Sequence, residues 1–253
     1  MCDSCNCDHG SPVTITGPEP VLADHHHHHH HLPQTRTIRL EREVLAKNDA
    51  VAEANRRYLR DRLVLALNLV SSPGSGKTTI LERTIVDLKG EMAIQVIEGD
   101  QQTRRDAERI SASGAEVVQV NTGAGCHLDS SMVARALERL KPPPQTLLFI
   151  ENVGNLVCPA LFDLGEASKV VIISVTEGED KPQKYPQMFQ AASLCLINKV
   201  DLLPHVNFQV KTCRELAAQV NPSLEFLEVS ATTGEGLPAW YDWLRRRRTE
   251  LLA

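Results

Sequence analysis

From residue 63 to the end of the chain, short hydrophobic runs alternate with longer stretches in which apolar residues recur at helical spacing. The hydrophobic runs predict seven strands, at residues 63–70, 92–97, 116–120, 146–150, 169–175, 193–197 and 225–229. The stretches between them predict helices near residues 77–89, 102–112, 129–141, 183–192, 207–219 and 238–248. This alternation indicates an α/β fold in three layers, a mostly parallel β-sheet with helices on both faces.

Residues 36–62 precede this alternation and carry many charges, yet their apolar positions recur at near-helical spacing. The pattern predicts an N-terminal helical segment that packs across the edge of the domain. Asn48 and Asp49 are residues typical of a helix start, so a second helix is expected to begin there.

The last predicted helix ends in four arginines, Arg245 to Arg248, and has Trp240, Trp243 and Leu244 on one side. Basic residues at the C-terminus of a helix complement its dipole. We interpret the arginines in this way rather than as a nucleic-acid patch, because the chain has a formal net charge of -5.

The length of 253 residues allows one to two domains, and a single α/β domain fits it. A hydrophobic content of 42% is enough for a substantial core. No apolar run approaches the roughly 18 residues that a membrane-spanning helix needs, so no membrane insertion is expected. The polar, Cys-rich start does not resemble a secretory signal. Seven cysteines in such a chain indicate metal ligands or free thiols rather than disulfides and predict a cytoplasmic protein.

The sequence Ser71-Ser72-Pro73-Gly74-Ser75-Gly76-Lys77-Thr78-Thr79 lies between the first predicted strand and a helical stretch, as a phosphate-binding loop requires. Gly74 and Gly76 let the backbone approach phosphate oxygens, and the N–H groups of the loop and of the helix N-terminus donate to them. Lys77 is expected at the β- and γ-phosphates and Thr78 at Mg²⁺. The usual pattern begins with Gly, where this chain has Ser71. The loop predicts the fold of a P-loop NTPase in residues 36–253.

Two further motifs indicate which base is bound. Asn198-Lys199-Val200-Asp201 follows a predicted strand, where Asp201 would accept from N1–H and the 2-amino group of guanine. Asn198 would hold the loop and another edge of the base, and Lys199 would lie along the ring. Ser230-Ala231-Thr232 fits a second guanine loop, in which backbone N–H groups meet the O6 atom. The motifs favour GTP over ATP.

Two acidic motifs end predicted strands close to the phosphate-binding loop. In Glu151-Asn152-Val153-Gly154, Glu151 can hold Mg²⁺ through water, and Gly154 can sense the γ-phosphate through its N–H group. In Glu98-Gly99-Asp100, Asp100 is expected to contact Mg²⁺ or to place the attacking water. The alternative for both motifs is an acid at a strand end that is merely solvated.

Residues 1–35 contain almost no residues that could form a core, so we expect this segment to be disordered without metal. Cys2, Cys5 and Cys7 can bind one soft cation, and thiolates with nitrogen ligands suit square-planar Ni(II). A zinc ribbon would need a second Cys pair nearby. The alternative is a tail that binds nothing.

The same tail contains seven consecutive histidines, His25, His26, His27, His28, His29, His30 and His31. Such a run is also typical of an expression tag. However, this run is internal and follows a natural-looking start, which favours a native segment that binds several Ni(II), Zn(II) or Cu(II) ions weakly.

Cys126 and His127 lie in a predicted glycine-containing loop, and Cys158 comes four residues after Gly154. Two thiolates and one imidazole are good ligands for Zn(II) or Ni(II), and they leave room for a further ligand. By contrast, Cys195 is in an apolar strand and Cys213 in a helix, so both are expected to be buried and inert.

Together these motifs closely resemble the hydrogenase nickel-incorporation GTPases, the HypB family in the SIMIBI class of P-loop GTPases. Ser71 matches this family's own variant of the phosphate-binding loop. The resemblance covers nearly the whole chain and rests on Cys2-x2-Cys5-x-Cys7, the His run, the loop from Ser71 to Thr78, Glu98-Gly99-Asp100-Gln101-Gln102-Thr103, Gly125-Cys126-His127-Leu128-Asp129, Glu151-Asn152-Val153-Gly154-Asn155-Leu156-Val157-Cys158-Pro159 and Asn198-Lys199-Val200-Asp201.

The resemblance implies slow, Mg²⁺-dependent GTP hydrolysis, a homodimer favoured by GTP, and metal binding at Cys126, His127 and Cys158. It also implies delivery of nickel to the large subunit of a [NiFe]-hydrogenase, with a zinc-containing partner of the HypA type. Because Cys158 and Gly154 share one short segment, we expect the GTP or GDP state to gate metal release.

Two alternatives remain. A related GTPase could serve urease or a cobalamin mutase, although the Cys126, His127 and Cys158 arrangement favours hydrogenase. A nickel storage protein is the second alternative, which the His run supports.

Overall fold

The structure, a computed structural model, describes residues 34–100, 105–123 and 125–253, with side chains from residue 42 onward. The strands of this part of the chain form one sheet in the order β3-β2-β4-β1-β5-β6-β7, and all neighbouring strands are parallel. They are β1 (Leu65–Ser71), β2 (Ile94–Asp100), β3 (Glu116–Asn121), β4 (Leu147–Glu151), β5 (Ser168–Ser174), β6 (Ala192–Asn198) and β7 (Glu225–Glu228). The seven predicted strands are therefore confirmed, as is the three-layer fold.

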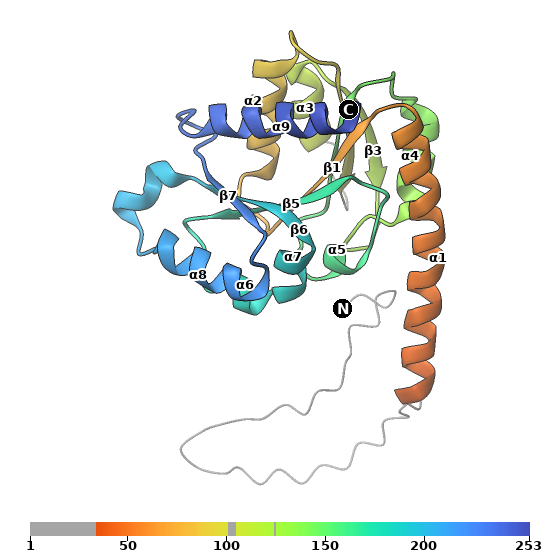
Figure 1. Ribbon diagram of the computed structural model, residues 1–253, viewed down its shortest axis with the longest axis horizontal. Coiled ribbons are helices and arrows are strands. Elements are labelled where there is room, and N and C mark those ends of the chain that lie inside the picture. Colours follow the sequence, from red (N-terminus) through yellow and green to blue (C-terminus); the bar gives the residue numbers. More distant parts are fainter. Residues whose placement is uncertain (1–33, 101–104, 124) are drawn as a thin grey trace, which may run out of the picture.

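Helices cover both faces of the sheet (Figure 1). The described helices are α1 (Gln34–Asp61), α2 (Lys77–Leu88), α3 (Arg105–Ser113), α4 (Ser130–Leu140), α5 (Cys158–Leu161), α6 (Lys181–Lys184), α7 (Pro186–Ala191), the 3-10 helix η1 (Val200–His205), α8 (Val210–Val220) and α9 (Leu237–Leu252). On one face, α2 and α9 pack over β1 and α3 packs over β2 and β3, and all three helices share one hydrophobic core with leucines of β1. The other face is shared by α1 with α4 and by α7 with α8.

The alternation of side chains along β1 explains these layers, because successive residues of a strand point to opposite faces. Leu65, Leu67 and Leu69 belong to the core beneath α2 and α9, whereas Ala66 and Val70 belong to the cores on the opposite face. All the residues of β1 are buried, as expected for the central strand of a parallel sheet.

Helix α1 differs from the prediction for residues 36–62, because it is one continuous helix with no new start at Asn48. It also begins at Gln34, two residues inside the predicted tail. Asn48 is buried and its side chain makes tertiary contacts instead of a cap: it accepts from the Ser130 N–H group and donates to the Asp163 carbonyl.

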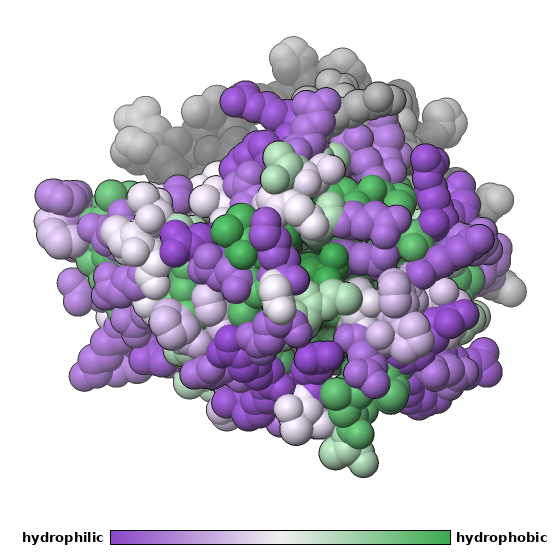
Figure 2. Space-filling view, turned by 90° about the horizontal axis from the view of Figure 1, so that it is seen from above, coloured by the Kyte–Doolittle hydropathy of each residue, from purple (hydrophilic) through white to green (hydrophobic). Residues whose placement is uncertain are grey.

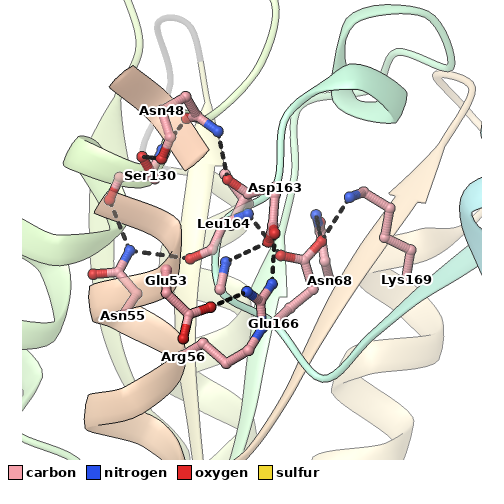
Figure 3. A network of polar contacts seen from close by, with 11 residues as sticks. Asn48, Glu53, Asn55, Arg56, Asn68, Ser130, Asp163, Leu164, Glu166 and Lys169 are labelled. Carbon is pink, nitrogen blue, oxygen red and sulfur yellow. Dashed lines mark hydrogen bonds and ion pairs between the residues drawn. The ribbon is translucent and has the colours of Figure 1, made fainter. Parts of the chain in front are cut away.

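Asn55, which lies on the same face of α1 as Asn48, also makes tertiary hydrogen bonds. The Asn55 amide donates to the carbonyls of Ser130 and Leu164, at 2.9 and 3.0 Å. Figure 3 shows Asn48 and Asn55 on α1 directed toward Ser130 and toward the turn at Asp163 and Leu164. The polar residues of α1 therefore fix the helix to α4 and to the segment before β5.

Two other helix predictions are wrong in their boundaries. The helix expected at residues 183–192 is two short helices that divide at Tyr185, since the residue before a proline disfavours the helical conformation and Pro186 follows. Helix α9 continues to Leu252, so the run from Arg245 to Arg248 lies inside the helix rather than at its end. Sequence patterns also did not predict α5 or η1.

Three of the four arginines of α9, Arg245 to Arg247, form ion pairs with acids instead of completing a helix terminus. Arg245 pairs with Glu91 and Asp242, and Arg246 pairs with Glu225. Figure 2, which views the molecule from above α2, α3 and α9, shows a mostly hydrophilic surface with small scattered hydrophobic areas. Beneath it, Trp240, Trp243 and Leu244 are buried as predicted.

Of the helices in the part of the chain that the structure describes, none combines the length and hydrophobicity needed to span a bilayer.

The turn between β7 and α9 supplies a stability test. Gly234 and Gly236 both have positive φ, +87° and +72°, but a Cβ at Gly236 would lie 1.9 Å from the Glu228 carbonyl oxygen, whereas one at Gly234 would meet only Arg83, at 3.6 Å. We expect Gly234→Ala to lower the free energy of unfolding by about 1 kcal/mol, the cost of a left-handed residue. Gly236→Ala should lower it by about 3 kcal/mol or more, because backbone must also move. Urea denaturation measures both, and equal losses would contradict this packing.

Candidate functional site

The phosphate-binding loop lies at the C-terminal end of β1, the edge of a parallel α/β sheet at which ligands bind. It borders a cavity of about 580 Å³. The cavity is lined by Ser71, Ser72, Pro73, Gly74, Ser75, Gly76, Lys77, Thr78, Thr79, Asp100, Asp106, Arg109, Val153, Gly154 and Lys199. The structure thus brings together the loop, Asp100 and Gly154, which are far apart in the sequence.

The predicted base-binding motif holds this loop in position. Asn198 donates from its amide to the Ser75 carbonyl at 2.8 Å, and Lys199 donates to the Gly74 carbonyl at 2.8 Å. A Cβ at Gly76 would lie 2.4 Å from the Asn198 amide nitrogen, so only glycine permits this approach. Of the N–H groups of the loop, that of Ser75 donates to the Ser72 carbonyl at 3.4 Å, and the others suit an anion in the cavity.

The second predicted guanine loop is also attached to Asn198, whose side-chain oxygen accepts from the Ala231 N–H group at 3.3 Å. Ser230 is buried beside Ala231. In the neighbouring η1, one carboxylate oxygen of Asp201 is buried and has no hydrogen-bond partner among the described residues. An acceptor in this situation is suited to the paired N–H donors of a guanine edge.

Glu151 contacts both side chains of the phosphate-binding loop that are predicted to meet phosphate and Mg²⁺. Its Oε1 accepts from Lys77 Nζ at 2.8 Å and from Thr78 Oγ1 at 2.6 Å. Its Oε2 is buried without a hydrogen-bond partner in the described structure. Carboxylate and hydroxyl oxygens are the ligands that Mg²⁺ prefers, so Thr78, Glu151 and nearby Asp100 fit this ion.

Glu98 lies opposite Glu151 in the pairing of β2 with β4. Burial, together with the negative charges of Glu151 and Asp100, raises the pKa of Glu98 to about 8. At neutral pH the folded protein therefore favours a protonated Glu98 beside a site that concentrates carboxylates.

A cluster of three metal-ligand residues lies next to this site. Cys126 and His127 come from the loop between β3 and α4, and Cys158 is the first residue of α5. Their ligand atoms all lie within 4.8 Å of one another, with the two sulfurs 3.1 Å apart and Cys126 Sγ 3.6 Å from His127 Nδ1. This spacing permits one ion to contact all three.

The imidazole of His127 is held in a form that suits metal binding. Its ring packs against Phe162, with centroids 4.1 Å apart. Burial lowers the pKa of His127, so the ring is neutral at pH 7 and has a free lone pair.

The remaining described cysteines, Cys195 and Cys213, are not suited to binding metal. Cys195 and Cys213 are fully buried, as predicted. Burial raises the pKa of the Cys195 thiol and raises that of Cys213 to about 12, so both remain protonated thiols that bind metal poorly.

Several residues of the site were not predicted. Asp106 and Arg109 of α3 line the cavity, and Arg109 is held by Glu82 at 2.6 Å. Lys181 donates to the Ser72 hydroxyl of the phosphate-binding loop at 3.0 Å. In the sequence, Asp106 and Arg109 have the i,i+3 charge spacing of an ordinary helix surface, and Lys181 belongs to no motif, so none of them signals a binding site.

The metal-binding residues predicted in the tail lie outside the described residues. These are Cys2, Cys5, Cys7, His25, His26, His27, His28, His29, His30 and His31.

Comparison with known proteins agrees with this geometry. The family model for the CobW/HypB/UreG nucleotide-binding domain matches residues 65–228. The hydrogenase maturation factor HypB of Rhizobium leguminosarum bv. viciae is 61% identical over 213 residues, which cover 84% of this chain and 71% of that protein. The hydrogenase/urease maturation factor HypB of Helicobacter pylori is 40% identical, over 85% of this chain and 90% of that protein.

Two solved structures have the same fold. The crystal structure of HypB from Helicobacter pylori in complex with nickel has a TM-score of 0.76 and 38% identity, covering 81% of this chain and 96% of that one. The crystal structure of the hydrogenase maturation factor HypB from Archaeoglobus fulgidus has a TM-score of 0.75 and 40% identity, covering 80% of this chain and 99% of that one. With its phosphate-binding loop and three-residue metal-ligand cluster, the chain belongs to the HypB family of hydrogenase maturation factors.

Proposed function

We propose that the protein is a GTP-hydrolysing nickel metallochaperone that supports nickel insertion into the large subunit of a [NiFe]-hydrogenase. The observation that carries this proposal is the continuity of residues 151–158. This segment begins at Glu151, which contacts Lys77 and Thr78 in the nucleotide cavity, and ends at Cys158 in the metal-ligand cluster. The nucleotide state would therefore gate metal release, because one segment belongs to both sites.

In the hydrolytic reaction, catalysis is mainly positioning and stabilisation of the transferred phosphoryl group. Lys77 would bind the β- and γ-phosphates, and Gly154 would donate its N–H group to the γ-phosphate. Thr78, Asp100 and Glu151 would hold Mg²⁺, which supplies positive charge against the phosphate oxygens. Asp100 would also orient the attacking water. Loss of the γ-phosphate removes the acceptor for the Gly154 N–H group.

Nickel is the cargo of this proposal, and the thiolates of Cys126 and Cys158 with the His127 imidazole are its ligands. The same ligands also suit zinc, so the cluster is proposed for either ion. The tail residues Cys2, Cys5 and Cys7 and the run from His25 to His31 would add further nickel sites. We place the protein in the cytoplasm, as a GTP-favoured homodimer with a HypA-type nickel chaperone as partner.

The Helicobacter pylori relative is a hydrogenase/urease maturation factor, which supports urease as a second client for the same chemistry. Nickel storage is the other alternative, and the seven tail histidines support it. These three functions differ in whether they need GTP hydrolysis and in which enzyme is activated.

Guanine specificity is tested by Asp201→Asn. The amide replaces one acceptor oxygen with a donor, which mismatches the N–H donors of guanine but matches the C2 carbonyl of xanthine. We expect GTP affinity to fall by about 100-fold or more, and XTP binding to appear. Fluorescent-nucleotide titration measures both, with Asp242→Asn on exposed α9 as the control. Unchanged GTP affinity would contradict the role of Asp201.

The metal-ligand cluster is tested by counting bound metal. Full-length protein with both Cys126→Ala and Cys158→Ala should bind one equivalent of nickel or zinc fewer than the wild type in equilibrium dialysis. The matched control, with Cys195→Ala and Cys213→Ala, should retain that equivalent because these thiols are buried and protonated. If the two double variants bind the same amount of metal, the cluster is not a metal site.

The cellular role is tested in a strain that lacks the native copy of this gene. Lys77→Ala should fail to restore hydrogenase activity, whereas Lys211→Ala, on the exposed surface of α8, should restore it as the wild type does. Urease activity measured in the same strains identifies the second client. Full hydrogenase activity with Lys77→Ala would overturn the GTPase proposal and favour storage.

A further inference from the structure

The loop that contains Cys126 and His127 is attached at several points to the segments that border the nucleotide cavity. One attachment is the Leu128 N–H group, which donates to the side-chain oxygen of Asn152 at 3.1 Å. Asn152 directly follows Glu151 and is 1% exposed. Leu128 in turn directly follows His127. One buried hydrogen bond thus joins the neighbours of a proposed Mg²⁺ residue and a proposed nickel ligand.

The oxygen of Asn152 has a second donor, the N–H group of Val153 at 3.0 Å. That N–H belongs to the peptide between Asn152 and Val153, one residue before Gly154. The same acceptor is therefore shared between the turn that would sense the γ-phosphate and the loop that would bind metal. Rotation of the Val153 peptide must change the hydrogen bond to Leu128, because a displaced donor alters the position of the shared amide.

The amide nitrogen of Asn152 is hydrogen-bonded to a side chain of the sheet. Its nitrogen donates to the Asn68 side chain in β1 at 3.3 Å, and the Asn68 amide donates to Glu166 at 3.1 Å. Glu166 also pairs with Lys169 at 2.8 Å. Figure 3 shows Asn68 beside Glu166 and Lys169. This buried network limits the amide to few orientations, so a shift at Val153 is passed to Leu128 rather than lost in side-chain rotation.

A similar arrangement recurs at Asn155, one residue beyond Gly154. The Asn155 amide nitrogen donates to the Cys126 carbonyl at 3.3 Å, and its oxygen accepts from the Val157 N–H group at 2.8 Å. Val157 immediately precedes Cys158. The two asparagines thus join both ends of the phosphate-sensing turn to both ends of the Cys126–Leu128 loop.

The side chain of Leu128 provides contact with the other segment beside the phosphates. It is fully buried, and a Cβ added at Gly99 would lie 2.7 Å from it. Gly99 is the residue between Glu98 and Asp100. Leu128 therefore packs directly on the backbone that positions Asp100, so both phosphate-facing segments contact the residue after His127.

From these contacts we propose that Asn152 and Asn155 are positioning residues that couple the nucleotide state to the metal affinity of the Cys126, His127 and Cys158 cluster. The inference rests on the proposed function, because it requires that the turn at Gly154 responds to the γ-phosphate. Neither asparagine is required to touch nucleotide or metal. Their removal should separate two binding events while leaving each possible.

The test measures how zinc changes the affinity of the full-length protein for GDP and for a non-hydrolysable GTP analogue, in excess Mg²⁺. Coupling is reciprocal, so the zinc effect on nucleotide preference equals the nucleotide effect on zinc affinity. The Cys126→Ala variant gives the baseline for this change in nucleotide affinity. Any zinc effect that persists in this variant comes from zinc bound to the tail or to the nucleotide itself.

Above that baseline, we expect zinc to change the ratio of the two nucleotide affinities by about tenfold in the wild type, and by less than about twofold in Asn152→Ala. The control is Asn221→Ala. The Asn221 amide likewise accepts from a nearby backbone N–H and donates to the carbonyls of Phe189 and Ala192, but it is remote from both sites. It should retain the full zinc effect.

A full zinc effect in Asn152→Ala would overturn the inference while leaving the proposed function intact. If Asn152→Ala does not fold, Asn155→Ala decides, since this side chain is only half-buried. It should lose most of the zinc effect, and retention of the wild-type effect would overturn the inference. Absence of a zinc effect in the wild type itself would instead reject the nucleotide gating on which the inference rests.

Discussion

The functional architecture depends on the parallel pairing of β1 with β4. In this register Leu69 lies beside Glu151, so the phosphate-binding loop after β1 and the acidic segment after β4 leave the same edge of the sheet side by side. Lys77 and Thr78 can then share one carboxylate oxygen of Glu151. Because both strands are buried on both faces, this arrangement is fixed by the core and does not depend on the loops themselves.

The segment that leaves the C-terminal end of β4 carries ligands suited to two different kinds of metal ion. Residues 151–158 begin with an oxygen ligand suited to Mg²⁺ and end with a sulfur ligand suited to nickel or zinc. The facing loop contributes Cys126 and His127 and is hydrogen-bonded to the segment through Asn152 and Asn155. The proposed nucleotide site and the proposed metal site therefore lie at two ends of one packed segment rather than on two modules joined by a linker.

Much of this could be predicted from the sequence, because the relevant signals are local. Each strand of the buried sheet is a short apolar run, and the phosphate-binding loop has a fixed spacing of Gly, Lys and Thr. The metal-ligand cluster was predicted from residue chemistry and from family resemblance, and the structure brings its ligand atoms within 4.8 Å.

Features decided by tertiary contacts were not predicted. Asn48 resembles a helix start in the sequence but bonds Ser130 and Asp163 from the middle of α1. Arg245 resembles a helix-terminal cation but pairs with Glu91, which is distant in the sequence. Asn152 gives no signal in the sequence, and its hydrogen bond with the Leu128 N–H group is visible only in the structure. In each case the partner lies far along the chain, where local patterns carry no information.

In the proposed mechanism, the nucleotide state changes the metal site itself. The most direct measurement is nickel K-edge X-ray absorption on full-length protein with Cys2→Ser, Cys5→Ser and Cys7→Ser and with each histidine from His25 to His31 replaced by alanine. The protein is loaded with one nickel equivalent, first with GDP and then with a non-hydrolysable GTP analogue. We expect sulfur ligands from Cys126 and Cys158 in one state and a change in their number or distance in the other. Identical spectra in the two states, in protein that binds both nucleotides, would contradict the account.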